Sequence, residues 1–283
     1  MNSDRCVFPA LRTEHLDSAL NCANTLGLVQ VVGDNWLEPG PHHDKLERLR
    51  QDAALSFHFV GMNIAGEDPL DLSYLKRILS LIHRYQPSRV SDHLSVQVHQ
   101  GFYFHDLLPF PRTEASLARI IERVDGIQET LGRRILVENL SAYHQFPESD
   151  VEECDFLSAM HQATNCGILL DLNNLKINHL NGGTSPTHFI RRIPVHAVEE
   201  IHIAGGVQSG RFWIDDHGSY PSIDTINLAK KPMFASTPIF YERDENLIPW
   251  HQFYEECLNL NSAILGKVES PLPGRDSQNE LHI

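Results

Sequence analysis

The amino-acid sequence predicts a (β/α)8 barrel, and three observations lead to this fold class. Short β-branched or apolar runs alternate with longer amphipathic stretches along nearly the whole chain, which is the pattern of repeated βα units around a parallel sheet. About eight strand candidates of this kind can be counted. The length of 283 residues is close to the roughly 250 residues of one such barrel. We therefore expect a single barrel domain over residues 1–267.

The strand candidates are short and mostly apolar, with β-branched or aromatic residues that favour extended structure. Each precedes a helix candidate or a loop, as the strands of repeated βα units do. In chain order they are 6–11 (CVFPAL), 28–33 (LVQVVG), 55–61 (LSFHFVG), 88–95 (SRVSDHLS), 133–139 (RRILVEN), 166–174 (CGILLDLNN), 198–205 (VEEIHIAG) and 237–244 (TPIFYERD).

Two helices are predicted most clearly, over residues 71–85 and 113–132, because apolar residues recur there at three- and four-residue spacing. Thr113 is a suitable N-cap for the second helix and Gly132 a suitable C-terminal stop. Residues 268–283 are polar and punctuated by proline, so we expect them to form a flexible tail.

Composition excludes two classes of partner. The chain has 23 Lys+Arg against 37 Asp+Glu, so its net charge of −14 repels a polyphosphate backbone and argues against nucleic acid. The N-terminus has no apolar signal-peptide core, and no later run approaches the roughly 18 uncharged residues that a membrane span requires. We expect a cytoplasmic protein without membrane contact.

The cysteines give no sign of a metal or redox site, whereas the number of histidines suits metal binding. The five cysteines are scattered without a C-x-x-C pair, which indicates reduced, structural thiols. The 17 histidines are unusually many for a chain of this size, and imidazole is the commonest metal ligand.

Polar side chains that can bind metals occur late in successive strand candidates. In a (β/α)8 barrel the C-terminal ends of all strands converge on one mouth, so these residues become neighbours there. The loop after the seventh strand adds two more in WIDDHG. The nine candidate ligands are His58, His93, Glu138, Asp171, Asn174, His202, Asp215, His217 and Glu242.

The charges of this set favour bound metal. Its four carboxylates would repel one another and raise each other's pKa unless two or three divalent cations neutralised them. Imidazole and carboxylate ligands without thiolate suit iron, manganese or zinc, and do not choose among these metals. Taken singly, each residue has a plain structural explanation: a satisfied core histidine, a turn at Asp171 and Asn174, or a solvated loop at Asp215 and His217. Only their joint placement favours a metal site.

Several segments, in order and at characteristic spacing over roughly residues 25–260, carry a resemblance to a known family. The chain resembles the multinuclear non-heme iron-dependent oxidative enzymes, which modify ribosomally made peptides and include the methanobactin-biosynthesis oxidase and the enzyme of 3-thiaglutamate formation. The segments are SDHLS (91–95), HDLLPFPRTE (105–114), LGRRILVENLSAY (131–143), CGILLDLNN (166–174), EIHIAG (200–205), DDHG (215–218) and YERD (241–244).

The resemblance implies a xylose-isomerase-like barrel with two to three iron ions in mixed Fe(II)/Fe(III) states. It implies a catalytic role for Glu138, His202 and Asp215. The implied ligand sets are His58, His93 and Glu138 for one iron, Asp171, His202 and Glu242 with bridging Glu138 for a second, and Asn174, Asp215 and His217 for a third.

The activity implied by the resemblance is an oxidation by dioxygen, as co-substrate, of a cysteine in a ribosomally synthesised precursor peptide. A separate partner protein is expected to recognise the leader part of that peptide. Asn35 and Asn139, which also come late in strand candidates, are expected to orient the substrate. Three departures bear on the substrate pocket. Gly206 stands where many relatives have histidine, HFVGMNIAG stands where HGVGLSLG is common, and CVFPALR replaces a glycine-rich first strand.

Two other classes of function share these features. A hydrolase or isomerase of the same architecture is one, either apurinic-endonuclease-like or sugar-isomerase-like. The endonuclease motif has histidine where Asn174 stands, and the net acidity disfavours nucleic acid. A non-catalytic metal-binding or scaffold protein is the other, and it would enclose its metals without an open coordination position.

Overall fold

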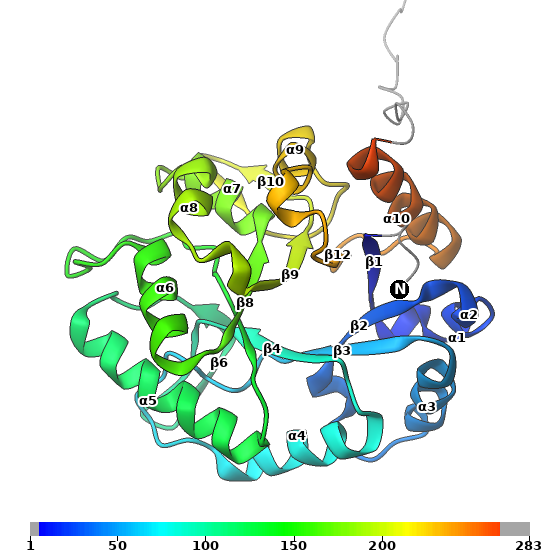
Figure 1. Ribbon diagram of the computed structural model, residues 1–283, viewed down its shortest axis with the longest axis horizontal. Helices are drawn as coiled ribbons and strands as arrows, with labels where there is room; N and C mark the ends of the chain where they lie inside the picture. Colours follow the sequence, from blue (N-terminus) through cyan, green and yellow to red (C-terminus); the bar gives the residue numbers. More distant parts are fainter. Residues whose placement is uncertain (1–5, 267–283) are drawn as a thin grey trace, which may run out of the picture.

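Eight parallel strands close into a barrel in the computed structural model, which describes residues 6–266 (Figure 1). Each of the eight predicted strand segments overlaps one barrel strand, and β3 begins one residue before its predicted segment, so the predicted fold class is confirmed. The predicted tail over 268–283 lies outside the described residues. The barrel strands are β1 Val7–Leu11, β2 Leu28–Val32, β3 Ala54–His58, β4 Arg89–His93, β7 Leu136–Glu138, β8 Gly167–Asp171, β9 Val198–Ile203 and β12 Ile239–Tyr241.

Helices surround the barrel, and the short helical turns lie in its connections (Figure 1). The α-helices are α1 Leu16–Leu20, α2 Ala23–Leu26, α3 His42–Asp52, α4 Leu72–Tyr85, α5 Glu114–Leu131, α6 Glu153–Thr164, α7 Leu172–Leu180, α8 Pro186–Arg192, α9 Ile223–Ala229 and α10 Trp250–Leu265. The 3-10 turns are η1 Thr13–His15, η2 Gly33–Trp36, η3 Val195–Ala197 and η4 Pro232–Phe234. Within the described part of the chain, no helix is long and apolar enough to cross a membrane.

Alternation along strand β3 separates an apolar outer side from a polar inner side. In β3, Leu55 and Phe57 are fully buried, and the Phe57 ring packs edge-on against Tyr85 of α4 at 5.7 Å between centroids. Ser56 and His58 therefore point to the other side, into the barrel. There the Ser56 hydroxyl donates a hydrogen bond of 2.6 Å to Glu200 of β9. Polar side chains thus line one part of the barrel interior, and Phe8, Ala10, Leu28 and Phe240 form a small apolar cluster separate from the main core.

Strand register brings the candidate ligands to one level of the barrel. His58 at the end of β3 pairs with Ser91 of β4, and His93 pairs with Glu138 at the end of β7. Asp171 at the end of β8 pairs with His202 of β9. Since the strands are parallel, all these ends face the same mouth.

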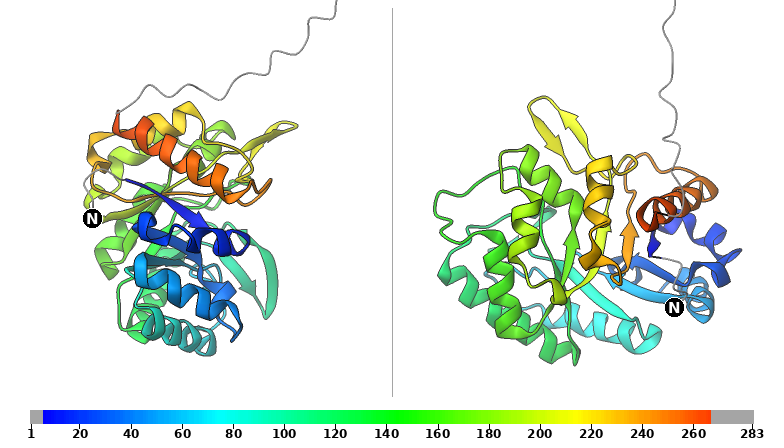
Figure 2. Two further views of the ribbon diagram at one scale, coloured as in Figure 1. Left: turned by 90° about the vertical axis from the view of Figure 1, so that its right-hand side faces the viewer. Right: turned by 45° about the horizontal axis from the view of Figure 1, so that its top comes forward.

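Two β-hairpins, which the sequence patterns had not predicted, follow barrel strands at the mouth. They are formed by β5 Val96–His99 with β6 Phe102–Leu108, and by β10 Val207–Ser209 with β11 Phe212–Ile214. The left view of Figure 2 shows both extending on the side to which β1 points. The hairpins therefore rise beside the opening of the barrel.

The predicted cap of α5 is present. The Thr113 hydroxyl accepts the Ser116 N–H at 3.1 Å, and the Ser116 hydroxyl accepts the Thr113 N–H at 2.9 Å, which makes a reciprocal capping box. Gly132 ends the helix in the left-handed conformation, with φ of 63°. Both sequence predictions for the ends of this helix are confirmed.

Replacing Thr113 with alanine is expected to lower the free energy of unfolding by about 1 kcal/mol, because one helix N–H loses its acceptor. Urea unfolding checks this, with Thr130→Ala as the matched control: Thr130 lies inside α5, where its hydroxyl donates only to the Gly126 carbonyl. Equal losses in the two variants would contradict the cap's contribution.

Candidate metal centre

Three groups of metal-binding side chains lie at the mouth of the barrel, and they are linked by shared residues. Within each group the ligand atoms lie within 4.8 Å of one another. Glu138 belongs to the first and second groups, and Asp171 belongs to the second and third. The groups are His58, His93 and Glu138; Glu138, Asp171 and His202; and Asp171, His217 and Glu242.

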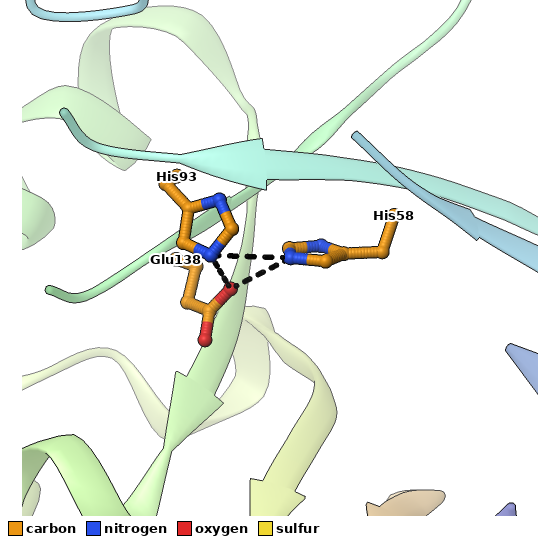
Figure 3. Close-up of side chains that lie close together, drawn as sticks. All are labelled: His58, His93 and Glu138. Atoms are coloured by element: carbon orange, nitrogen blue, oxygen red, sulfur yellow. Dashed lines mark hydrogen bonds and ion pairs between the residues drawn. The ribbon is translucent and has the colours of Figure 1, made fainter. Parts of the chain in front are cut away.

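The first group joins the ends of β3, β4 and β7 (Figure 3). Glu138 Oε2 lies 3.3 Å from His58 Nε2 and 3.2 Å from His93 Nε2, and the two nitrogens are 3.2 Å apart. Ser91 Oγ lies 2.9 Å from His58 Nδ1 and so fixes the ring from behind. One carboxylate oxygen and two imidazole nitrogens therefore face a common point.

Burial and neighbouring charges shift the pKa values of the two histidines in opposite directions. Burial, together with His93 and His202, lowers the pKa of His58 well below its usual range. Burial also acts to lower the pKa of His93, but Glu138 and Asp92 outweigh it and raise that pKa to about 9. In the metal-free protein at neutral pH, the His58 ring is therefore neutral, while the His93 ring is protonated on both nitrogens and positively charged.

The second group is deeper, and His202 at its centre is fully buried. His202 Nδ1 lies 3.3 Å from Glu138 Oε1 and 3.1 Å from Glu242 Oε2. Burial alone lowers the pKa of His202, but these two carboxylates raise it well above the usual value. Burial and the charges of Asp215 and Glu138 raise the pKa of Asp171. Without a cation, the centre must hold protons to limit carboxylate repulsion.

Of the two predicted loop residues, His217 belongs to the third group and Asp215 lies beside it. His217 Nε2 lies 3.0 Å from Asp215 Oδ1, so the structure brings this predicted pair together. The ligand atoms of His217 cluster with those of Asp171 and Glu242. The part of Asn174 in this group, which the resemblance implied, stays a prediction. Asn174 is buried next to Asp171, whose Oδ1 accepts the Asn174 backbone N–H at 2.6 Å.

The donor atoms fit metal ions because many of them are buried without a hydrogen-bond partner. Buried polar atoms in proteins are nearly always paired, since an unpaired one costs about 1–3 kcal/mol. Several buried atoms of this centre make no hydrogen bond, although other polar atoms lie close to them. They are Glu138 Oε2, Asp171 Oδ2, Asn174 Oδ1, both ring nitrogens of His202, and His217 Nε2. Coordination to cations would satisfy these atoms together.

Zinc binding to the metal-free protein is expected to tighten as the pH rises from about 6.5 to about 9. The pKa of His93 is about 9, so below that value a proton must leave the ring before it can bind metal. Each displaced proton strengthens the apparent affinity by about tenfold per pH unit. Competition with a coloured chelator measures this, and a zinc affinity independent of pH would show that His93 is not a ligand.

Two residues that sequence reasoning overlooked support the centre. Arg12, which follows β1, donates from Nη2 to Glu242 Oε1 at 3.3 Å and from Nε to Asp244. Asp244 Oδ2 in turn lies 2.9 Å from His217 Nδ1. Arg12 had the same signal as the predicted ligands, a polar residue directly after a barrel strand, and Asp244 stands in the YERD segment two positions after Glu242.

The two asparagines predicted to orient substrate occupy different places. Asn35 is not in a strand but in η2 after β2, where it is exposed. Asn139 is fully buried, and its amide accepts the Asp171 N–H at 2.9 Å and donates to the Asp171 carbonyl at 3.0 Å. Asn139 therefore fixes the backbone of a candidate ligand, and its contact with substrate stays a prediction.

Close neighbouring atoms explain why glycine stands at position 206. A Cβ there would lie 2.8 Å from the Ile214 carbonyl oxygen and 2.9 Å from Ile177 Cδ1. Both distances are shorter than van der Waals contact, so β11 takes the space that a side chain at 206 would need. A histidine at this position would require the β10–β11 hairpin to shift.

A fourth group of possible ligands, Glu152, Cys154 and His188, lies at the start of α6 and on α8. Arg192 Nη1 already lies 3.1 Å from Glu152 Oε1 and 3.2 Å from His188 Nε2. The Arg192 guanidinium therefore occupies the place where a metal cation would bind. Burial raises the pKa of the Cys154 and Cys166 thiols to about 11. This group is therefore an ion-pair cluster, and the two thiols remain protonated at neutral pH.

A cavity of about 620 Å³ lies between the loop after β7 and the α7–α8 segment. Tyr143 lines it, and the Tyr143 hydroxyl accepts the backbone N–H of Asp215 at 2.9 Å. The cavity is therefore adjacent to the loop of the metal centre. Its volume falls in the range of about 300–1,000 Å³ that is usual for small-ligand sites.

The closed barrel with polar groups at its mouth defines a class, the xylose-isomerase-like TIM barrels. Solved structures of this class match the chain at low sequence identity and so show the fold alone. Endonuclease IV from Thermus thermophilus has a TM-score of 0.59 at 14% identity, over 93% of this chain and all of that one. D-psicose 3-epimerase has a TM-score of 0.56 at 12% identity, over 92% of this chain and 94% of that one.

The family follows from sequence. The model of the family described as RiPP precursor modification enzyme MbnB/TglH/ChrH matches residues 10–264, and the chain belongs to this family. A UPF0276 protein of Acaryochloris marina is 35% identical over 84% of this chain and 87% of its own length. A UPF0276 protein of Rhizobium meliloti is 39% identical over 71% of this chain and 64% of its own length. The predicted family is thus confirmed.

Proposed function

We propose that this chain is a multinuclear iron-dependent oxidase that uses dioxygen to modify a cysteine of a ribosomally synthesised precursor peptide. The observation that carries the proposal is the run of three linked histidine–carboxylate groups at the mouth of a barrel from a peptide-modifying family. The three groups would hold two to three iron ions, with Glu138 and Asp171 each shared between neighbouring groups. Bound iron supplies the one-electron and dioxygen chemistry that side chains alone do not provide.

The protein's own contribution to this reaction is position, charge and proton handling. His202 Nδ1, which lies within 3.3 Å of Glu138 and Glu242, would keep those carboxylates apart and oriented. Asp215 is nearer the opening, with its side chain 10% exposed and its Oδ1 accepting from Asn173 Nδ2 at 2.6 Å. We assign Asp215 the role of accepting the proton that the substrate thiol releases when it becomes a thiolate.

The substrate is proposed to enter beside Tyr143. The 620 Å³ cavity could hold a few residues of a peptide next to the Asp215 loop, so that a cysteine side chain reaches the mouth. A separate protein is proposed to bind the leader part of the peptide. With that partner, the same cysteine would be presented repeatedly at high effective concentration.

Iron analysis combined with oxygen uptake tests the proposed function. Protein purified without oxygen is expected to contain two to three iron ions per chain, and to consume oxygen with a cysteine-containing precursor peptide encoded beside it. A zinc-loaded preparation is the control. Activity with zinc alone, unaffected by iron, would contradict an oxidase and favour a hydrolase or isomerase of the same architecture.

The partner is tested separately with three substrates under air: free cysteine, the peptide, and the peptide with the neighbouring candidate partner. The proposal expects little oxygen uptake with free cysteine and efficient conversion only with peptide and partner together. Equal rates for all three would remove the need for a partner while leaving the oxidase proposal intact.

A further inference from the structure

Asp244 contacts His217 twice, through its side chain and through its backbone. Asp244 Oδ2 lies 2.9 Å from His217 Nδ1, and the Asp244 backbone N–H donates to the His217 carbonyl at 3.0 Å. His217 has a φ of 50°, which is uncommon for a residue with a side chain and costs free energy unless neighbours hold it. The two contacts from Asp244 supply that support on the side away from Asp215.

Asp244 is itself held by a cation from the neighbouring strand. β1 pairs with β12 through Pro9 and Tyr241, which brings Arg12 at the end of one strand beside Glu242 and Asp244 at the end of the other. Arg12 donates to both carboxylates, and its side chain is only 13% exposed. The guanidinium therefore fixes the supporting carboxylate and a candidate ligand in one arrangement.

These contacts decide which nitrogen of His217 is available. A carboxylate at Nδ1 favours the tautomer with the proton on Nδ1, and this leaves the lone pair on Nε2. His217 Nε2 is buried and makes no hydrogen bond, although Asp215 Oδ1 is 3.0 Å away. Without Asp244, the ring could rotate or take the other tautomer, and Nε2 would no longer be presented to the centre.

We propose that Asp244 and Arg12 are positioning residues, which hold His217 with Nε2 directed at the third group of ligands. Asp244 fixes the ring, and Arg12 fixes Asp244 while it neutralises one of the negative charges beside Glu242. The inference deepens the proposed function, and it rests on the metal centre proposed there. It assigns a role to the first strand and to the last residue of the YERD segment, neither of which supplies a ligand to the three groups.

The test uses the full chain loaded with zinc, so that it does not depend on iron or on activity. Without a cation, burial acts to lower the pKa of His217, but Asp215, Asp244 and Glu242 outweigh it and raise that pKa well above the usual value, and a ring protonated on both nitrogens has no tautomer. Nitrogen-15 NMR of labelled histidines reports the tautomer of His217 directly. Wild-type protein is expected to show the Nδ1-protonated form, and Asp244→Ala to show a mixture. Asp244→Asn should stay close to wild type, because the asparagine oxygen can still accept from Nδ1. Glu245→Gln, which changes an exposed neighbour, is the control for loss of one charge.

Zinc affinity provides the second readout. Loss of a carboxylate that supports a metal-binding histidine typically weakens metal affinity by about 10–100-fold. Asp244→Ala and Arg12→Gln are expected to show this loss for one ion, with the remaining ions held as in wild type, and Arg12→Lys should recover part of it. Circular dichroism confirms that each variant is folded, and Arg12→Gln replaces Asp244→Ala if the latter does not fold.

An unchanged His217 tautomer together with wild-type zinc affinity in Asp244→Ala would overturn the inference. If Asp244→Ala does not fold, wild-type zinc affinity in Arg12→Gln would overturn it. The result is separable from the function proposed above. If the protein bound zinc but no iron and oxidised nothing, the tautomer and zinc results would still decide the role of Asp244.

Discussion

Glu138→Gln is expected to remove at least one metal ion per chain and to abolish oxygen-dependent conversion of the peptide, while the barrel stays folded. Each carboxylate oxygen of Glu138 faces a different group: Oε2 faces His58 and His93, and Oε1 faces His202. Glutamine keeps the size of the side chain but has one oxygen and no charge. It cannot serve two cations, and it relieves carboxylate repulsion in the metal-free state.

Glu200→Gln is the matched control for this variant. Glu200 is another fully buried acid of the barrel interior, hydrogen-bonded to Ser56 and Gln30, and it belongs to none of the ligand groups. Its substitution should leave metal content near wild type. Iron analysis, circular dichroism and peptide conversion on one preparation give the answer, and a fully active, iron-replete Glu138→Gln would refute the assignment of the centre.

Asp171→Asn is expected to have the second large effect, with opposite signs for metal binding and for stability. Asp171 belongs to two ligand groups, and its Oδ1 also caps α7 by accepting the Asn174 N–H. Asparagine keeps the cap through its remaining oxygen but lacks the charge that neutralises a cation. Metal content should fall by at least one ion, and peptide conversion should be lost.

The stability effect of Asp171→Asn follows from the sign of the pKa shift. Burial, Asp215 and Glu138 raise the pKa of Asp171, so its ionisation destabilises the metal-free fold, and stability is lost as the pH rises above the unfolded value. At pH 7 the metal-free variant should be more stable than wild type, because asparagine removes the charge that burial, Asp215 and Glu138 disfavour. Urea unfolding in the presence of chelator measures this. Lower stability of the variant would mean that Asp171 mainly supports the fold.

The barrel could be predicted because its strands follow simple patterns. Apolar runs of uniform length alternated with amphipathic segments, and polar residues such as His93 and Glu138 stood at the ends of those runs. A parallel barrel brings the C-terminal ends of all its strands to one mouth, so these polar residues could be predicted to lie together. The ligands on strands were therefore easier to predict than those on loops.

The hairpins were harder to predict because they are hardly buried. Phe102 is 73% exposed and Tyr103 is 55% exposed, so β6 carries no apolar periodicity toward a core. One signal was present: Gln100 and Gly101 both have positive φ and form the two-residue turn between His99 and Phe102. A glycine in a two-residue connection between extended runs could have indicated this hairpin.

The grouping of the third set of ligands depends on a loop conformation that spacing does not specify. His217 adopts a positive φ, and its ring is oriented by Asp244 from the end of β12. Neither fact is visible in the segment DDHG. The positions of Asp215 and His217 could therefore be predicted as a pair, but their neighbours Asp171 and Glu242 could not be assigned to them without the folded loop.

Anomalous diffraction at the iron absorption edge tests the multinuclear centre most directly, on crystals of protein purified without oxygen. We expect separate iron peaks within the groups that contain His58, His202 and His217, with Glu138 between the first two. Peaks at two or three of these positions would establish the centre. No iron peak at the mouth of the barrel, or a metal bound elsewhere on the chain, would contradict it.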